Sequence, residues 1–178
     1  MSRRALEQAR SRLGARGLYV GASVCHLPFS DNAFDAVVSL HTIYHVEKDQ
    51  QETAVRQLIR TVRPGGRVIV VYANPDRLVA RLLRWLRPAR TKPAASIYYH
   101  AHPLNWWDRF GDQASLNVLP WRSLVAQESK LLPSVVAKPA LQLVLKFERN
   151  FSRLAARFGA YPMIVLTKLA TQSDQPTE

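Results

Sequence analysis

The sequence predicts an α/β protein with a doubly wound, mostly parallel sheet, and three features support this class. Residues 34–40 (FDAVVSL) and 67–73 (RVIVVYA) are short, nearly continuous apolar runs, a pattern typical of strands buried on both faces. Residues 49–62, which lie between the two runs, place apolar side chains at helical spacing. A strand, a helix and a second strand joined in this way form a parallel crossover unit, the building block of an α/β sheet.

The elements around this unit follow from local signals. Within residues 1–14, Leu6, Ala9 and Leu13 recur at helical spacing, and residues 17–22 (GLYVGA) resemble a short strand. Asp49 is a candidate cap for the central helix, with Glu52 three residues later as its capping-box partner. The segment 64–66 (PGG) is expected to end that helix and to supply a tight turn before the next strand.

The second half of the chain is less regular, but its order can be predicted. Residues 76–86 alternate leucine with arginine and predict a basic amphipathic helix. A short helix is expected over residues 103–110, and a strand over residues 115–121. Residues 139–158 form a long helical stretch, and residues 161–168 (YPMIVLTK) predict the last strand.

Composition excludes several classes of protein. A chain of 178 residues has the size of one domain, and 47% hydrophobic residues exclude a disordered composition. The single cysteine excludes an internal disulfide, and no apolar run of about 18 residues predicts a membrane-spanning helix. Lys and Arg number 25 against 13 acidic residues, a net charge of +12 that favours anionic partners. We expect a cytoplasmic protein, with a membrane-peripheral location as the alternative.

Four motifs occur in a specific order along the chain. Leu27-Pro28-Phe29 is followed by Asp31, and Phe34-Asp35-Ala36-Val37 opens the first buried strand. The segment His41 to His45 follows the end of that strand, and Arg63-Pro64-Gly65-Gly66-Arg67 precedes the next one. Together these motifs resemble the class I S-adenosylmethionine-dependent methyltransferases, in the broad group sometimes called type 11.

The resemblance implies a partial Rossmann-like methyltransferase sheet whose last strand is antiparallel and whose first two strands are absent. It is close over residues 1–75 and looser up to the last strand. We therefore expect residues 1–170 to form an incomplete methyltransferase domain, and residues 171–178 to be a disordered tail. Within it, residues 76–158 would supply the helical lid and the insertions on the substrate side.

The resemblance also implies a binding site for S-adenosylmethionine. Ligands of open α/β sheets bind beyond the carboxyl ends of the strands, where Ser39, Leu40 and His41 would pack beside the cofactor. Ser23, with Val24 beside it, occupies the position at which the family usually has an acidic residue for the adenine amine. A serine oxygen accepts this hydrogen bond without the assistance of a charge.

Two cofactor-binding elements of the family are missing from this sequence. It contains neither the glycine-rich loop nor the strand-ending carboxylate that binds the ribose hydroxyls. The opening residues resemble the helix that follows this carboxylate, so our hypothesis is that Met1 is an internal methionine of a longer methyltransferase. The fragment alone is then expected to be inactive, and poorly soluble unless a partner covers its unpaired strand edges.

Histidines are the candidates for catalysis. Methyl transfer requires mainly alignment, and a base only where the acceptor must lose a proton. His41, His45, His100 and His102 are the candidate bases, and ordinary core or pocket-wall histidines are the alternative for each. No metal site is predicted, because His100 and His102 lack carboxylate or cysteine companions at useful spacing.

The predicted function is the transfer of a methyl group to a small, hydrophobic acceptor. One alternative is a non-catalytic methyltransferase-like subunit that binds a partner or a membrane, and another is an RNA- or polyanion-binding protein. Arg77, Arg81, Arg84 and Arg87 are the candidate contacts to an anionic membrane. A lid helix with a solvated arginine face explains the same pattern, and nucleic acid is the less favoured partner.

Overall fold

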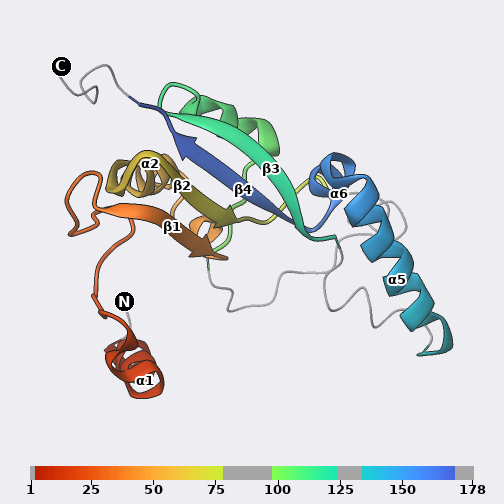
Figure 1. Cartoon of the computed structure of the whole chain (residues 1–178), viewed down its shortest axis with the longest axis horizontal. Helices are drawn as coiled ribbons and strands as arrows, with labels where there is room; N and C mark the ends of the chain where they lie inside the picture. The colour runs from red at the N-terminus through yellow and green to blue at the C-terminus, as the bar shows by residue number, and fades with distance from the viewer. Residues whose placement is uncertain (1–2, 78–97, 124–133, 171–178) are drawn as a thin grey trace.

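The computed structural model describes residues 3–77, 98–123 and 134–170, which build a four-stranded mixed sheet (Figure 1). The strands are β1 (Phe34–Leu40), β2 (Val62–Val71), β3 (Ala114–Arg122) and β4 (Tyr161–Lys168), in the spatial order β1-β2-β4-β3. β1 and β2 are parallel, whereas β4 runs antiparallel to both β2 and β3. The α/β class and the antiparallel last strand are confirmed, although antiparallel pairs make up more of the described sheet than the sequence predicted.

Helices of the described chain cover one face of this sheet. Alternate residues of β2 and β4 pair across the sheet, Val68 with Leu166 and Val70 with Ile164, so these four share a face and all are buried. The cover consists of α2 (Gln51–Thr61), the 3₁₀ helix η3 (Leu104–Phe110) and α6 (Ser152–Phe158). The buried stripe predicted on α2 and the aromatic side chains of η3 join the strands in one core.

The other described helices lie outside this core. They are α1 (Arg3–Leu13), α5 (Ser134–Asn150) and the 3₁₀ turn η1 (Gly14–Arg16), whereas the 3₁₀ turn η2 (Ile43–His45) contributes Ile43 and Tyr44 to the core. Figure 1 shows α1 apart from the sheet, and none of its residues is buried. The long helical stretch predicted near the carboxyl end is confirmed, but it is divided into α5 and α6 at Phe151, whose backbone leaves the helical region.

The prediction that β1 is buried on both faces is wrong. Val38, on the face away from α2, is 57% exposed, and Leu40 on the same face is half exposed. β1 is the edge strand of the described sheet, and the helices cover the opposite face, on which Ser39 is buried. The apolar run of β1 is thus typical of a strand covered on both faces, but the described helices cover only one of them.

The strand predicted at residues 17–22 is also wrong. This segment is extended but unpaired, and Leu18 is 97% exposed. The β pairing that follows this segment in the described chain is an isolated antiparallel bridge between Ser23 and His26. An extended segment becomes a strand only when an edge accepts its hydrogen bonds, and within the described residues β1 pairs with β2 alone.

The start of β2 corrects two further details. Residues 62–66 belong to β2 instead of forming a separate turn, and the pairing with β1 shifts between Phe34 and Ala36. Gly65 has a positive φ of 74°, and a Cβ on Gly66 would lie 2.7 Å from the carbonyl oxygen of Asp35. Only glycine suits these two positions without strain, which explains the PGG sequence.

The first turn of α2 differs from the predicted capping box. Gln50, not Asp49, occupies the N-cap position, and no side chain caps the helix there. Glu52 instead binds Arg56 at 3.0 Å and Arg109 at 2.8 Å, so it connects α2 to η3. The basic helix predicted at residues 76–86 begins at Asp76, which lies in a turn, and its residues from 78 onward lie outside the described residues. The predicted tail at residues 171–178 also lies outside them.

Arg60 of α2 organises the Leu27-Pro28-Phe29 motif. Its guanidinium donates hydrogen bonds to the carbonyl oxygens of Leu27 at 3.0 Å and Phe29 at 2.8 Å, and it forms an ion pair with Asp31. This segment leads directly into β1. The motif therefore marks the place where the chain is fastened to α2 before it enters the sheet.

Candidate functional site

The candidate site lies at the carboxyl ends of the parallel strands β1 and β2. The chain turns sharply after β1 at His41, which has a positive φ of 55° and donates its backbone N–H to the carbonyl oxygen of Val71. Ser39 is buried beneath this turn, whereas Leu40 is half exposed at the open side of β1. Three of the predicted cofactor residues, Ser39, Leu40 and His41, therefore lie at the carboxyl end of β1, the end of an open α/β sheet at which ligands bind.

His41 is held by two aromatic neighbours. Its Nδ1 lies 2.9 Å from the hydroxyl oxygen of Tyr44, and its ring meets the ring of Tyr161 edge-on at 4.8 Å. Burial lowers the pKa of His41, and the positive charges of Arg122 and His45 lower it further. The imidazole is therefore neutral at pH 7. When Nδ1–H donates to Tyr44, the lone pair of Nε2 remains available to accept a proton.

Tyr44 is the centre of an aromatic cluster formed by His41, Tyr44, His45, Tyr72 and Tyr99. The ring of Tyr44 lies 5.7 Å from Tyr72, 5.2 Å from Tyr99 and 4.6 Å from His45. Burial raises the pKa of Tyr44 to about 12, with smaller contributions from Tyr161 and Tyr99. Tyr44 therefore stays protonated at physiological pH and orients His41 as a neutral hydrogen-bonding partner.

A buried polar network ties the segment 98–102 to the same edge. The Tyr72 hydroxyl donates to Oε1 of Gln51 at 2.9 Å and accepts the backbone N–H of His102 at 3.0 Å. The Gln51 amide donates to the carbonyl oxygen of His100 at 2.8 Å and to that of Val46 at 3.0 Å. Burial raises the pKa of Tyr72 to about 12, so its donor proton is retained.

The four candidate histidines do not form one group. His41 and His45 belong to the aromatic cluster, and Nδ1 of His45 lies 2.8 Å from the carbonyl oxygen of Tyr98. His102 stacks on Trp106 at 4.4 Å, and burial lowers its pKa, followed by the charges of His100 and Arg109. His100 meets His102 edge-on at 4.7 Å. Among the four, His41 is the one at the carboxyl end of a strand.

Ser23 and Val24, the other predicted cofactor residues, lie in the loop before β1. The Ser23 hydroxyl oxygen accepts the backbone N–H of Cys25 at 3.3 Å, and Val24 packs against the edge of the core. In the part of the chain that the structure describes, no hydrogen bond links Ser23 to residues 39–41. Their role at the cofactor site stays a prediction.

Sequence reasoning did not identify Tyr44, Tyr72 or Tyr161 as parts of the site. Tyr44 follows His41 by only three residues, but His41 precedes η2 and has a positive φ, so helical spacing does not predict their contact. Tyr72 follows the end of β2 and Tyr161 begins β4, and only the antiparallel pairing of β2 with β4 brings them together.

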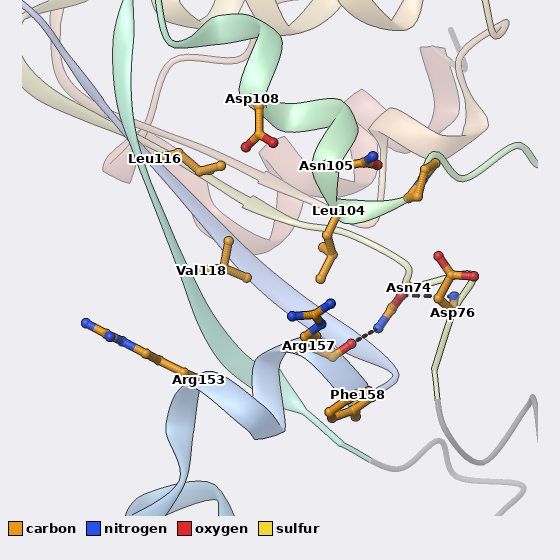
Figure 2. Close-up of a pocket in the computed structure, with 11 residues that line it drawn as sticks. Asn74, Asp76, Leu104, Asn105, Asp108, Leu116, Val118, Arg153, Arg157 and Phe158 are labelled. Carbon is orange, nitrogen blue, oxygen red and sulfur yellow. Dashed lines mark hydrogen bonds between the residues drawn. The ribbon is translucent and has the colours of Figure 1, made fainter.

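A cavity of about 690 Å³ opens beside this edge, between η3, β3 and α6 (Figure 2). Leu104, Leu116 and Val118 form its apolar floor, as Figure 2 shows. Charged and amide side chains surround it: Asp76, Asn105, Asp108, Arg153 and Arg157. Its size and mixed lining suit a small molecule with an apolar body and polar substituents.

Asn74, just beyond β2, fixes one wall of this cavity. Its side-chain amide donates to the carbonyl oxygens of Arg157 at 2.8 Å and Gly159 at 3.0 Å. Its own oxygen accepts the backbone N–H of Asp76 at 3.0 Å. One buried side chain thus joins the carboxyl end of β2 to the end of α6 and to the next turn of the chain (Figure 2).

The first part of this chain is similar in sequence to known methyltransferases. Residues 1–70 match the family model described as "Methyltransferase domain". The chain is 39% identical over 77 residues to the ubiquinone/menaquinone biosynthesis C-methyltransferase UbiE of Haemophilus ducreyi, covering 39% of this chain and 29% of that protein. It is 34% identical over 76 residues to the methyltransferase GfsG of Streptomyces halstedii, covering 39% of this chain and 26% of that protein.

The chain spans only part of such relatives. Its match to an uncharacterized protein of Mycobacterium tuberculosis is 30% identical over 95 residues and covers 34% of that protein. Among solved structures, it resembles a SAM-dependent methyltransferase of Thermotoga maritima, a possible histamine N-methyltransferase. That match has a TM-score of 0.59 at 17% identity and covers 94% of this chain and 70% of the other.

A further neighbour is the N-methyltransferase NodS of Bradyrhizobium japonicum in complex with S-adenosylhomocysteine. The TM-score is 0.53 at 13% identity, and 96% of this chain and 64% of that chain are covered. These likenesses show the fold. Separately, no described helix is both long and apolar enough to cross a membrane.

Proposed function

We propose that this chain, whose residues 1–70 match the methyltransferase-domain family model and whose fold resembles that of S-adenosylmethionine-dependent methyltransferases, supplies the carboxyl-terminal part of such an enzyme. The observation that carries the proposal is the turn at His41. It places a neutral histidine, its tyrosine partner and the half-exposed Leu40 at the carboxyl end of β1. The acceptor is a small molecule with a hydrophobic body.

The residues at this edge fit one side of a cofactor. Leu40 offers an apolar contact, the His41 turn leaves the outer side of β1 free of described strands, and Ser39 lies beneath. The glycine-rich loop and the ribose carboxylate are not in this sequence. The proposal therefore assigns Ser39, Leu40 and His41 to one wall of the site, and Ser23 and Val24 to its adenine side. When bound, S-adenosylmethionine would supply an activated methyl group.

This chain's own residues would orient the acceptor and hold a proton. The cavity beside β2 receives the apolar body on Leu104, Leu116 and Val118. Tyr44 fixes the ring of His41, and Nε2 of His41 takes the proton where the acceptor must lose one. Tyr99 packs on Tyr44 at the exposed rim of the aromatic cluster.

The open face and edge of β1 support the further proposal that this chain is inactive alone. A site without the glycine-rich loop and without the carboxylate that binds the ribose hydroxyls loses most of its polar contacts to the cofactor. The remaining wall is apolar and half exposed. Additional strands and helices, from more of the same polypeptide or from a partner, would complete both the sheet and the site.

Isothermal titration with S-adenosylhomocysteine tests this proposal. The 178-residue chain is compared with the polypeptide translated from the same reading frame extended upstream. Binding by the extended polypeptide alone supports both parts of the proposal. Tight binding by the 178-residue chain contradicts its dependence on a completing segment. No binding by either contradicts the enzyme function and favours a non-catalytic methyltransferase-like subunit.

Residue-level roles are tested on whichever polypeptide binds. His41→Ala is expected to weaken binding and to slow methyl transfer. The matched control is His100→Ala, which removes a histidine ring that contacts His102 and should change both far less. Tyr44→Phe removes only the hydroxyl partner of His41, so it should shift the pH profile of transfer more than it changes affinity. Equal effects of the His41 and His100 substitutions would contradict the assignment.

A further inference from the structure

Helix α5 carries an exposed apolar surface that the methyl-transfer site does not use. α5 extends away from the sheet beyond α6 (Figure 1). Leu143 is 69% exposed and Leu145 is 59% exposed. Side chains of this size normally contribute to a core, so contiguous exposure on one helix marks a binding surface.

The exposed side chains follow helical rows. Leu143, Phe147 and Phe151 are spaced four residues apart and form one row, in which the rings of Phe147 and Phe151 lie 5.4 Å apart. Leu141 and Leu145 form a second exposed row. The row between them faces the protein body, where Glu148 accepts the backbone N–H of Ser123 at 2.9 Å. Both flanks of the helix are therefore apolar and accessible.

The charge on this unit is almost entirely positive. Lys138, Lys146 and Arg149 are exposed on the polar side of α5, and Arg153 and Arg157 follow on α6. Between residues 134 and 158 the sequence has a single acid, Glu148, which is engaged with Ser123. An apolar helix surface bordered by cations is complementary to an anionic surface with an apolar interior.

We propose that α5 binds an anionic lipid surface. The row Leu143, Phe147 and Phe151 enters the boundary between headgroups and acyl chains, while Lys146 and Arg149 on the adjoining polar side contact the headgroups. This surface differs from the arginines at positions 77–87, and the proposal is independent of methyl transfer.

Vesicle sedimentation with the full 178-residue chain tests the apolar part of the proposal. Binding is expected to vesicles of phosphatidylcholine with phosphatidylserine, and to weaken strongly when phosphatidylserine is omitted or salt is raised. Leu143→Ser with Phe147→Ser should weaken partitioning at least about tenfold, since two large side chains no longer insert. Leu18→Ser, which removes an exposed leucine outside α5, should leave partitioning unchanged.

A second pair of variants tests the charge. Lys146→Gln with Arg149→Gln should reduce partitioning about thirtyfold, because each cation near an anionic surface contributes roughly a factor of five. Arg3→Gln with Arg4→Gln removes the same charge from α1 and should have little effect. All these positions are exposed, and circular dichroism verifies that each variant folds.

Three outcomes would overturn the proposal. Equal losses in the α1 and α5 charge variants would show general electrostatic attraction in place of a docking helix. Indifference of binding to phosphatidylserine would exclude an anionic surface. A concentration-dependent dimer in sedimentation velocity that Leu143→Ser with Phe147→Ser abolishes, without lipid binding, would assign the surface to a second copy of this chain.

Discussion

The two faces of the sheet have similar strand residues but different surroundings. Val70 of β2 points toward α2 and is fully buried, whereas Val38 of the neighbouring strand β1 points to the other face and is 57% exposed. α2 and η3 provide a core for the first face. α/β sheets normally have helices on both faces. The difference indicates that the covered face stabilises this chain, whereas Val38 and Leu40 on the other face of β1 contribute little.

The largest effect should come from the aromatic core of the covered face. Trp107 in η3 is fully buried against Tyr72, Trp106 and Phe110, so Trp107→Ala should lower the free energy of unfolding by about 3–5 kcal/mol. Trp121→Ala, at a half-exposed position at the end of β3, is the matched control and should change it far less. Chemical denaturation measures both. Similar losses would show that the two faces are equally important.

The next largest loss of stability is expected from a substitution at the start of β2. Gly66→Ala should cost about 2–3 kcal/mol, because the new Cβ would lie 2.7 Å and 2.8 Å from the carbonyl oxygens of Asp35 and Arg63. Gly17→Ala, where the nearest atom lies at an ordinary contact distance of 3.7 Å, is the control and should be nearly neutral. A Gly66→Ala variant that unfolds at the wild-type denaturant concentration would refute this tight packing between β1 and β2.

Two valines, one on each face of the sheet, test whether the covered face contributes more to stability than the exposed face. Val70→Ala removes buried methyl groups and should cost about 2 kcal/mol, whereas Val38→Ala should cost less than about 0.5 kcal/mol in this chain. The ratio of the two losses in urea unfolding is the readout. If Val38→Ala is as costly as Val70→Ala, the face of β1 is already covered.

The smallest expected effect is a dependence of the stability of the fold on pH. Burial lowers the pKa values of His41 and His102 below their usual 6.5, so the unfolded chain binds more protons than the folded one between the folded pKa and 6.5. Stability is therefore fully present above pH 6.5 and decreases as the pH falls below it. His41→Gln should flatten this decrease, as thermal unfolding across pH 5 to 8 would show. A decrease of unchanged slope would mean that His41 is not the group responsible.

Much of the fold could be predicted from local patterns. The β1–α2–β2 unit and the YPMIVLTK strand have strong periodicity, and their positions were predicted almost correctly because these patterns suffice to define an element. Residues 17–22 have an equally apolar composition, but a strand also needs a neighbouring edge, which depends on the rest of the fold. The same dependence explains why burial of β1 on both faces was predicted incorrectly.

The positions of some candidate site residues could be predicted, although their roles stay predictions. Ser39 and Leu40 end a recognisable strand and His41 follows it, so their place at the carboxyl end of β1 could be inferred from the sequence. Tyr44 and Tyr161 contact His41 through a 3₁₀ turn and through a strand distant in sequence, and neither contact has a local pattern. The cavity beside Asn74 depends on α6 docking against β3, which the sequence does not specify.

Hydrogen exchange of the backbone amides of β1 tests the central claim most directly. The 178-residue chain is compared with the polypeptide extended upstream in the same reading frame, each with and without S-adenosylhomocysteine. The outward-facing amides of β1 should exchange rapidly in the 178-residue chain, and should be strongly protected in the extended polypeptide, with further protection near His41 on addition of ligand. Equal exchange of β1 in both polypeptides would contradict the claim that its open edge and face are completed to form the cofactor site.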